Sequence, residues 1–304
     1  MDEIDEILGT KQKANNYTTN RAYNNNYNNK NRTNNNKNDW IKQQNQDRQA
    51  IYDSMDRMAL IVGNDSSKFQ EYLNIQSKFV KHSVGNCLVI LEKAPDSTQI
   101  KDKNSWNEKG VELKDNAKSI KILEPHKSNG RTFFNPKEVY DISQTNAPKQ
   151  DTQINYDDRK LLQALLHKCD IPRESVDKLP DGTIGSLYDK QKNTLYVCKG
   201  MDRELLFQTL CQEMGNIEMK AEENSNIKSF WSYCISYLIC KRYGIDVSNY
   251  NFENLPHEIT NQKEPKGIRA EIENIRQNFE EINSRMTDFF EISNKEKNKS
   301  VPER

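Results

Sequence analysis

The sequence has few features of a metal site or of a disulfide framework. Its four histidines are never spaced as a metal-binding pair, and its six cysteines include no Cys-x-x-Cys pair. Most of the cysteines lie in apolar stretches, where a free cysteine behaves as a small hydrophobic side chain. We therefore expect reduced, buried thiols in a cytoplasmic protein, not the disulfides of a secreted one.

Long hydrophobic runs and net charge are also missing. No apolar stretch approaches the roughly 20 residues that span a membrane, and the acidic N-terminus is followed by no apolar signal-peptide core. The sequence therefore predicts no membrane partner. Basic and acidic residues balance at 45 each, so no global positive field attracts nucleic acid. Any such binding must come from local patches or from base stacking.

Hydrophobic residues make up only 34% of the 304 residues, which is little for a chain that is folded throughout. The deficit is concentrated in residues 9–38, which contain thirteen asparagines, three tyrosines, six basic residues and no acidic residue. We expect residues 1–46 to form a disordered, Asn-rich tail. This tail is either a solvated spacer or a weak tether, in which the cations meet phosphates while the tyrosines stack on bases.

Residues 47–146 show the periodicities of one mixed domain of helices and strands. Apolar residues recur at helical spacing in the first half of this segment, and Asp65 suits the N-cap of its second helix. Apolar and polar residues alternate in the second half, as in strands with one buried face. The expected helices cover residues 51–62, 69–79 and 85–92, and the expected strands cover residues 111–113, 119–123 and 138–142.

A polar segment at residues 147–155 forms the predicted linker to a second domain, residues 156–256. That domain is expected to contain a helix, a hairpin over residues 184–198 and two long helices over residues 202–221 and 226–243. The chain is thus predicted to be α+β, with two domains.

The last predicted helix, residues 264–292, carries an apolar seam in which the steps alternate between four and three residues. This spacing is that of a heptad repeat. Two alternatives are open: the seam packs on its own domain, or it pairs with a second chain or a partner in a coiled coil. Its members are Ile268, Ile272, Ile275, Phe279, Ile282, Met286 and Phe289.

The helix after the hairpin stands where zinc peptidases of the zincin class carry the motif HExxH. In that motif two histidines at i and i+4 bind Zn²⁺, and the glutamate between them polarises the metal-bound water. Here Gln212 and Asn216 stand at the two histidine positions, and only Glu213 remains. Neutral amides do not hold catalytic zinc, so we expect no metal, no cofactor and no catalytic residue. Taken alone, the stretch is also compatible with an ordinary helix.

Several segments occur in an order that resembles a known family. In the first domain these are Ile51–Ala59, Phe69–Leu73, His82–Asn86 and the stretch from Trp106 to Pro148, and in the second domain residues 156–250. Their order resembles the ArdC-type antirestriction proteins found on conjugative elements of Gram-positive bacteria. The resemblance covers about residues 49–290 and lies in the sequence of motifs, not in any one of them.

The resemblance implies an N-terminal domain that binds single-stranded DNA and a zincin-like C-terminal domain, in a protein that protects incoming plasmid DNA from restriction. The metal ligands of the family, carried over, fall on Gln212, Asn216 and Tyr233. The resemblance therefore implies a pseudo-metallopeptidase here, because none of these side chains is a zinc ligand of that class.

Two turns of the first domain supply most of the candidate DNA-binding residues. The turn at residues 78–86 offers two cations, an aromatic ring and a Gly-Asn pair that opens a helix, whose N–H groups can receive phosphate. The turn at residues 114–119 keeps two flanking lysines of the family's basic turn, with Asp115 in place of a cation. Trp106 is either a core residue or a platform for base stacking. The candidate DNA-binding residues are Lys78, Phe79, Lys81, His82, Asn86, Trp106, Lys114 and Lys118.

Three functions are compatible with these features. The first is a single-stranded-DNA-binding accessory or antirestriction protein of a conjugative plasmid, which the resemblance favours. The second is a non-enzymatic interaction module, which recruits a conjugation or restriction protein through the zincin-like domain and the C-terminal helix. The third is an enzyme that uses Glu213 without conventional zinc.

The purified protein should carry no stoichiometric zinc and should hydrolyse no peptide, because the residues at the ligand positions are two amides and a phenol. Elemental analysis of the purified chain and a peptide-hydrolysis assay measure the two properties. About one zinc per chain, lost in a Gln212→Ala variant, would contradict the prediction, since it would show a working ligand at that position.

Overall fold

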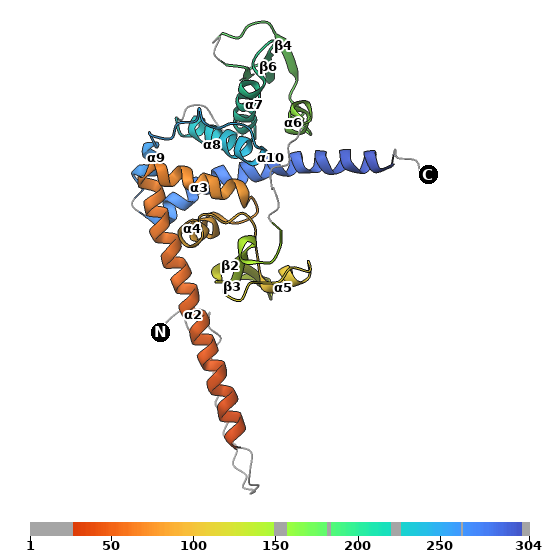
Figure 1. Cartoon of the computed structure of the whole chain (residues 1–304). Helices are drawn as coiled ribbons and strands as arrows, with labels where there is room; N and C mark the ends of the chain where they lie inside the picture. The colour runs from red at the N-terminus through yellow and green to blue at the C-terminus, as the bar shows by residue number, and fades with distance from the viewer. Residues whose placement is uncertain (1–26, 149–156, 181–183, 220–225, 263, 300–304) are drawn as a thin grey trace. The chain divides into compact units, whose positions relative to one another are not determined.

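Helix α2 (Tyr27–Asn64) is the first element of the computed structural model, which describes residues 27–148, 157–180, 184–219, 226–262 and 264–299 (Figure 1). The chain divides into two compact units, residues 1–43 and residues 44–304. The described part of the first unit is helical, and the side chains of Trp40 and Ile41 on it are exposed. The remaining elements all belong to the second unit.

Helix α2 begins earlier than the sequence predicts. Residues 27–46 are helical, whereas we expected a disordered tail up to residue 46. A helix that is nucleated in a packed segment extends at little further cost, and asparagine lowers helix propensity without forbidding a helix. Residues 1–26 lie outside the described part, so the prediction of a disordered tail is not tested there.

Three consecutive helices form the first part of the core, where the periodicity predicts them: α2, α3 (Ser66–Lys78) and α4 (Val84–Lys93). The predicted cap of α3 is confirmed, because the Asp65 carboxylate accepts a hydrogen bond of 3.0 Å from the N–H of Lys68. Ser83 caps α4 in the same way, through the N–H of Asn86 at 3.3 Å. The chain direction at both helix starts is therefore set by local hydrogen bonds.

The first sheet is antiparallel and has the strand order β1–β3–β2. The predicted strand at residues 111–113 is reduced to one bridge between Leu113 and Thr145. A turn begins at once, with the N–H of Ala117 bonded to the carbonyl of Lys114, and leaves no length for a ladder. The elements of this region are β1 (Ile100–Lys101), α5 (Lys103–Asn107), β2 (Ile120–Ser128), β3 (Arg131–Asp141) and the 3-10 turn η1 (Ile142–Gln144).

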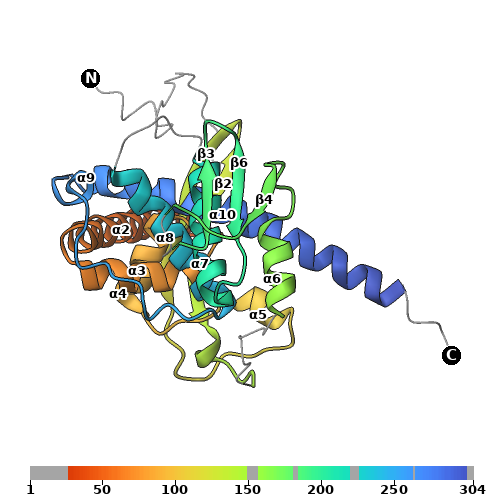
Figure 2. The same ribbon diagram turned by 90° about the horizontal axis from the view of Figure 1, so that it is seen from above.

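The second sheet has the order β4–β6–β5 and contains the predicted hairpin as β5 and β6. Strand β4, which runs parallel to β6, was not predicted. Figures 1 and 2 show this sheet next to helix α7, which contacts β5. The elements are α6 (Asp158–Leu165), β4 (Arg173–Val176), β5 (Ser186–Asp189), β6 (Thr194–Cys198), α7 (Arg203–Glu218), α8 (Asn226–Tyr243) and α9 (His257–Thr260).

Helices α7 and α8 approach each other closely at Gly215. A Cβ atom on Gly215 would lie 3.1 Å from both Cα and Cβ of Ser232, tighter than ordinary packing. Glycine at this position therefore sets how near the two helix backbones can come. Helix α8 ends at Gly244, whose φ of +75° is the left-handed conformation typical of a helix C-terminus.

The predicted division into two domains is not confirmed, because residues 44–304 form one unit. Helix α3 packs on α8, and the phenol of Tyr237 donates a hydrogen bond of 2.7 Å to Asn74. Arg242 donates a bond of 3.1 Å to the carbonyl of Ser77. The structure is thus a mixture of helices and two small sheets, as expected, with the two predicted halves fused. The predicted linker falls largely on residues 149–156, outside the described residues.

Helix α10 (Pro265–Lys299) carries the apolar seam and buries it within its own unit. Six seam residues, from Ile268 to Met286, are at most 1% exposed, and the helix packs on α4, α6, α7 and α8. Of the two alternatives for the seam, the structure therefore shows packing on the same chain. Neither α10 nor any other helix in the described ranges is long and apolar enough to cross a membrane.

Replacing Phe279 by alanine should lower the free energy of unfolding by about 3–5 kcal/mol, because the ring is fully buried at the centre of the seam. Urea denaturation measures this change, and Gln277→Ala on the exposed face of α10 is the matched control. An unchanged stability together with a lower mass in light scattering would instead assign the seam to pairing between chains.

Candidate nucleic-acid interface

The outer half of the hairpin formed by β2 and β3 is an exposed two-stranded ribbon, residues 124–135. At its tip Asn129 and Gly130 both have positive φ, 50° and 75°. Two positive φ values in a two-residue loop define a type I′ turn, for which Asn-Gly is the strongest sequence signal. This turn keeps the strands in register out to the pair Ser128 and Arg131.

Two consecutive phenylalanines on this ribbon are exposed. Phe133 and Phe134 leave 44% and 45% of their surface accessible to solvent. Since successive strand residues point to opposite faces, the ribbon carries one ring on each face. Lys127 and Arg131 are exposed on the same ribbon, and the structure gives them no ion-pair partner among the described residues. Exposed rings beside unpaired cations are what single-stranded nucleic-acid-binding surfaces combine.

Helix α2 holds the ribbon in place from one side. The guanidinium of Arg48 donates a hydrogen bond of 2.9 Å to the carbonyl of Phe134 and one of 3.3 Å to the side chain of Asn135. Nearer the core, on β2, the ammonium of Lys121 bonds the carboxylate of Asp47 at 2.7 Å. These bonds hold the backbone of the hairpin against α2.

A cavity of about 660 Å³, which we call cavity 2, lies between α2, the start of α4 and the first sheet. Phe134 and the half-exposed Tyr52 line it, as do Lys81 and His82 from the turn before α4. It therefore contains two exposed rings and a cation. We call the exposed residues of this cavity and of both faces of the ribbon the ribbon surface, and it consists of Tyr52, Lys81, Lys127, Arg131, Phe133 and Phe134.

The other charges of cavity 2 are mostly neutralised. The ammonium of Lys137 bonds Glu124 at 2.6 Å and Asp102 at 3.1 Å, and the bond to Glu124 raises the pKa of that lysine. Lys101 lies 5.8 Å from the centre of the Trp106 ring, and burial lowers its pKa. Lys81 is exposed and has no ion-pair partner within the described ranges. It is the lysine of cavity 2 best placed to meet a phosphate.

His82 faces cavity 2 as a neutral ring. Burial lowers its pKa from an ordinary value of 6.5, so the imidazole is uncharged at neutral pH. Its ring meets the buried ring of Phe79 edge-on, with centroids 5.6 Å apart. His82 therefore offers a hydrogen-bonding edge to a ligand, not a charge.

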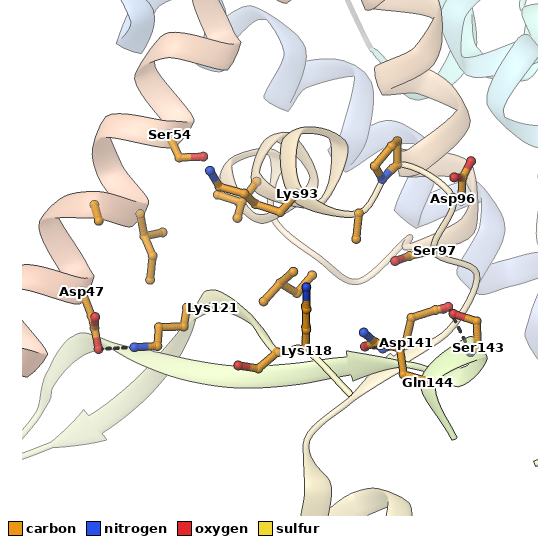
Figure 3. Close-up of a pocket in the computed structure, with 17 residues that line it drawn as sticks. Asp47, Ser54, Lys93, Asp96, Ser97, Lys118, Lys121, Asp141, Ser143 and Gln144 are labelled. Atoms are coloured by element: carbon orange, nitrogen blue, oxygen red, sulfur yellow. Dashed lines mark hydrogen bonds and ion pairs between the residues drawn. The ribbon is translucent and has the colours of Figure 1, made fainter. Parts of the chain in front are cut away.

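A second cavity, cavity 1, has a volume of about 690 Å³ and lies between α2, the end of α4 and the start of β2 (Figure 3). Lys121, at its edge, bonds Asp47, and Lys93 pairs with Glu92 at 3.0 Å. Lys118 lines the cavity without an ion-pair partner among the residues described. Cavities 1 and 2 are adjacent, because consecutive residues of β2, Lys121 and Ile122, line one and the other.

Three of the predicted DNA-binding residues reach these cavities with accessible polar groups: Lys81, His82 and Lys118. Two other lysines are engaged by carbonyl groups. Lys78 donates a bond of 3.2 Å to the carbonyl of Ser97, and Lys114 one of 2.8 Å to the carbonyl of Ser143. Their ammonium groups hold turns of the chain together, which limits their access to a phosphate.

The remaining three predicted residues are buried. Trp106 is 2% exposed, and its indole N–H donates a bond of 3.0 Å to the carbonyl of Tyr140. Its ring presents no open face for a base, so the alternative of a core residue agrees with the structure. Phe79 is 6% exposed. Asn86 lies at the edge of cavity 2, but both ends of its amide are bonded to the backbone of Leu123, at 2.8 and 2.9 Å.

The exposed phenylalanines and Tyr52 were not among the predicted site residues. Two signals in the sequence point to the ribbon. Asn129-Gly130 between strand-like stretches indicates a tight hairpin. Two consecutive aromatic residues on a strand cannot both face one core, since the side-chain period of a strand is two. Phe133 and Phe134 therefore imply an exposed ring on at least one face.

On helix α7, the residues at the positions of the HExxH motif make contacts within the fold. The Glu213 carboxylate accepts a bond of 3.2 Å from the N–H of Tyr188 on the edge strand β5 and one of 3.2 Å from the amide of Asn216. Burial raises the pKa of Glu213 above its ordinary value, against the lowering effect of these two bonds. Gln212 is half-buried beside it. Glu213 thus ties α7 to the sheet.

These residues do not fit the zinc ion that a zincin-like domain implies. Tyr233, at the expected third ligand position, accepts a bond of 2.6 Å from the N–H of Asn251 and packs its ring against Tyr250. In the part of the chain that the structure describes, no group of three or more histidine, cysteine or acidic side chains is arranged to hold a metal. Two amides and one carboxylate remain, a donor set too weak for zinc.

No protein family matches the chain, and no curated protein is significantly similar to it. Among solved structures it is similar to the antirestriction protein ArdC from the R388 plasmid, in a Mn(II)-bound and a metal-free crystal structure. The TM-scores are 0.44 and 0.40, at 10% sequence identity, over 67% of this chain and 85% of the ArdC chain. This likeness is distant, and the functional argument rests on the residues of this chain.

Replacing Glu213 by glutamine should leave the protein as stable as the unchanged chain at about pH 4 and more stable at about pH 8. The folded state raises the pKa of this carboxyl above its ordinary value of 4.5, so the unchanged protein loses stability as the pH rises from that value through the folded pKa. Glutamine keeps an acceptor for the N–H of Tyr188 and does not ionise. Urea denaturation at both pH values measures the difference.

Glu281→Gln, on the exposed face of α10, is the control for the loss of a carboxylate. A Glu213→Gln variant that is less stable at the higher pH would show that the ionised carboxylate is favoured in the fold, against the prediction.

Proposed function

We propose that the chain binds single-stranded DNA through the ribbon surface, as an accessory or antirestriction-type protein of a conjugative plasmid or element. The observation that supports this most is the exposure of Phe133 and Phe134 on a ribbon that also carries the unpaired cations Lys127 and Arg131. Exposure of an apolar ring to water is unfavourable, and the ring gains free energy of burial when an apolar or aromatic partner covers it.

The ribbon surface suits a single strand better than a duplex. A nucleobase offers its flat face to a ring only when it is unpaired and unstacked, and such stacking contributes about 1–3 kcal/mol per base. Few unpaired cations accompany the rings, and the formal net charge of the chain is zero. Binding that relied on phosphates alone would therefore be weak at physiological salt.

The plasmid and antirestriction part of the proposal rests on the order of motifs in the sequence, which resembles ArdC-type proteins over about residues 49–290. The same resemblance bears on the second half of the chain. We propose that this half is a pseudo-metallopeptidase with a structural role, because Glu213 and Tyr233 are engaged in hydrogen bonds within the fold.

Phe133→Ala and Phe134→Ala should each weaken the binding of a fluorescein-labelled single-stranded oligonucleotide by about 5- to 150-fold, since each removes a stacking platform. Fluorescence anisotropy titrations with the single strand and with the matched duplex measure the affinity. The unchanged protein should prefer the single strand clearly at physiological salt. Ile292→Ala, which removes an exposed apolar side chain on α10, is the matched control and should leave affinity unchanged.

The double variant Lys127→Gln, Arg131→Gln should reduce the slope of log K against log salt by about 1.4, because each lost phosphate contact on a single strand changes that slope by about 0.7. Lys266→Gln on α10 is the matched charge control. Equal affinity for single strand and duplex, or unchanged binding in all ribbon variants that fold, would contradict the proposal and leave the interaction-module alternative.

A further inference from the structure

Cavity 1 contains a buried hydroxyl group with no hydrogen-bond partner. Ser97 is 3% exposed, and its Oγ atom is buried without a partner. Figure 3 shows this hydroxyl pointing into the cavity. Buried polar groups are almost always hydrogen-bonded, because an unsatisfied one costs about 1–3 kcal/mol. A ligand group that reached this hydroxyl would complete its hydrogen bonding.

The backbone around Ser97 is held firmly, so the orientation of this hydroxyl is built into the fold. The N–H of Ser97 closes a tight turn on the carbonyl of Ala94 at 3.0 Å, and its carbonyl accepts the ammonium of Lys78. The next N–H, that of Thr98, donates a bond of 3.2 Å to the carboxylate of Asp141. Lys78, predicted as a DNA contact, is thus a positioning residue for this wall of cavity 1.

Donors and acceptors gather on the same side of cavity 1. Asp141, 8% exposed, lines it and keeps acceptor capacity beyond its bonds to Thr98 and Ser143. The side-chain carbonyl of Gln144 accepts the N–H of Asp141, which leaves its amide N–H groups as donors. With the hydroxyl of Ser97, this wall can both donate and accept, as the polar edge of a nucleobase requires.

The rest of the lining supplies an apolar surface and one available charge. Ala50 and Ile51 from α2, Val89 from α4 and Ile120 from β2 form the apolar part. Figure 3 shows the side chain of Lys118 extending into the cavity, and its ammonium has no ion-pair partner within the described residues. The volume of about 690 Å³ falls within the range of ligand pockets, roughly 300–1,000 Å³.

We infer that cavity 1 is a pocket for one nucleotide, with the base between the apolar side chains and its polar edge toward Ser97, Asp141 and Gln144, and with the phosphate at Lys118. The nucleotide is either one unit of a bound strand or a free nucleoside monophosphate. The first alternative, a unit of a bound DNA strand, rests on the proposed function, whereas binding of a free nucleotide does not. Cavity 1 adjoins cavity 2 along β2, so a strand on the ribbon surface can place one unit there.

Calorimetric titration with each of the four 2′-deoxynucleoside 5′-monophosphates tests the inference. 2-Deoxyribose 5-phosphate and inorganic phosphate are the controls without a base. At least one nucleotide should bind more tightly than both controls. Equal heats for nucleotides and inorganic phosphate, or no binding of any nucleotide, would overturn the inference.

The variant Ser97→Ala tests whether the Ser97 hydroxyl binds the ligand or stabilises the fold. The variant should be as stable as the unchanged protein or more stable, because it removes an unsatisfied hydroxyl, and it should bind the nucleotide about two- to tenfold more weakly. Ser67→Ala, at an exposed position of α3, is the matched control. A loss of stability without a loss of affinity would show that the hydroxyl serves the fold alone, and would overturn its assignment.

Two further variants change the cavity without touching its buried wall. Ala50→Leu narrows it from the exposed side of α2, and Lys118→Gln removes its available charge. Each should weaken nucleotide binding, while Lys266→Gln should not. If strands bind and the ribbon variants weaken them, but no cavity 1 variant affects nucleotide or strand, the inference fails and the proposed function stands. If nucleotides bind as expected but strands do not, the proposed function fails and the pocket stands.

Discussion

The pair of hydrogen bonds between the Asn86 amide and the backbone of Leu123 holds strand β2 against helix α4. Strand β2 is an edge strand, and its partner β3 has Pro136, which lacks an N–H, opposite Leu123. The Asn86 side chain donates and accepts as a neighbouring strand would, so the edge of the sheet is satisfied at a buried residue. Asn86 and Leu123 line cavity 2, and their near neighbours Val89 and Lys121 line cavity 1, so both cavities depend on this contact.

Electrostatics near the site follow from which cations are already paired. Lys121, Lys137 and Lys93 are held by acidic side chains of their surroundings, whereas Lys81 and Lys118 have no such partner among the residues that the structure describes. The pair Lys121–Asp47 joins the sheet to α2, whereas Lys93 pairs with its neighbour on α4 and Lys137 with residues beside β3. Charge available to an anion is therefore local, and a net charge of zero describes the whole chain without describing this surface.

Much of the fold follows from local rules in the sequence. Asp65 predicts the start of α3, and the heptad spacing identifies the buried face of α10, because capping and periodicity act within a few residues. The ribbon escaped prediction because residues 124–135 are exposed on both faces and show no apolar alternation. Strand β4 escaped because its pairing with β6 joins residues far apart in sequence.

The candidate site overlaps the predicted residues only in part, for a related reason. A lysine in a turn is exposed almost wherever the chain goes, so Lys81 and Lys118 reach solvent-filled cavities as their residue type suggests. An aromatic residue or an asparagine can either face solvent or be buried in tertiary contacts. Trp106 and Asn86 both carry groups that can bind DNA, yet tertiary contacts with Tyr140 and Leu123 occupy them. The sequence alone does not show which distant residues Trp106 and Asn86 contact.

Because the two halves form one unit, the packing of the second half bears on the fold of the first. Helix α8 supplies Tyr237 and Arg242 to the packing of α3. On α7, Gly215 is constrained by the close approach of Ser232, and Asn216 by its bond to Glu213. Substitutions at such packing positions would therefore disturb the first half of the chain without changing any residue that lines the cavities.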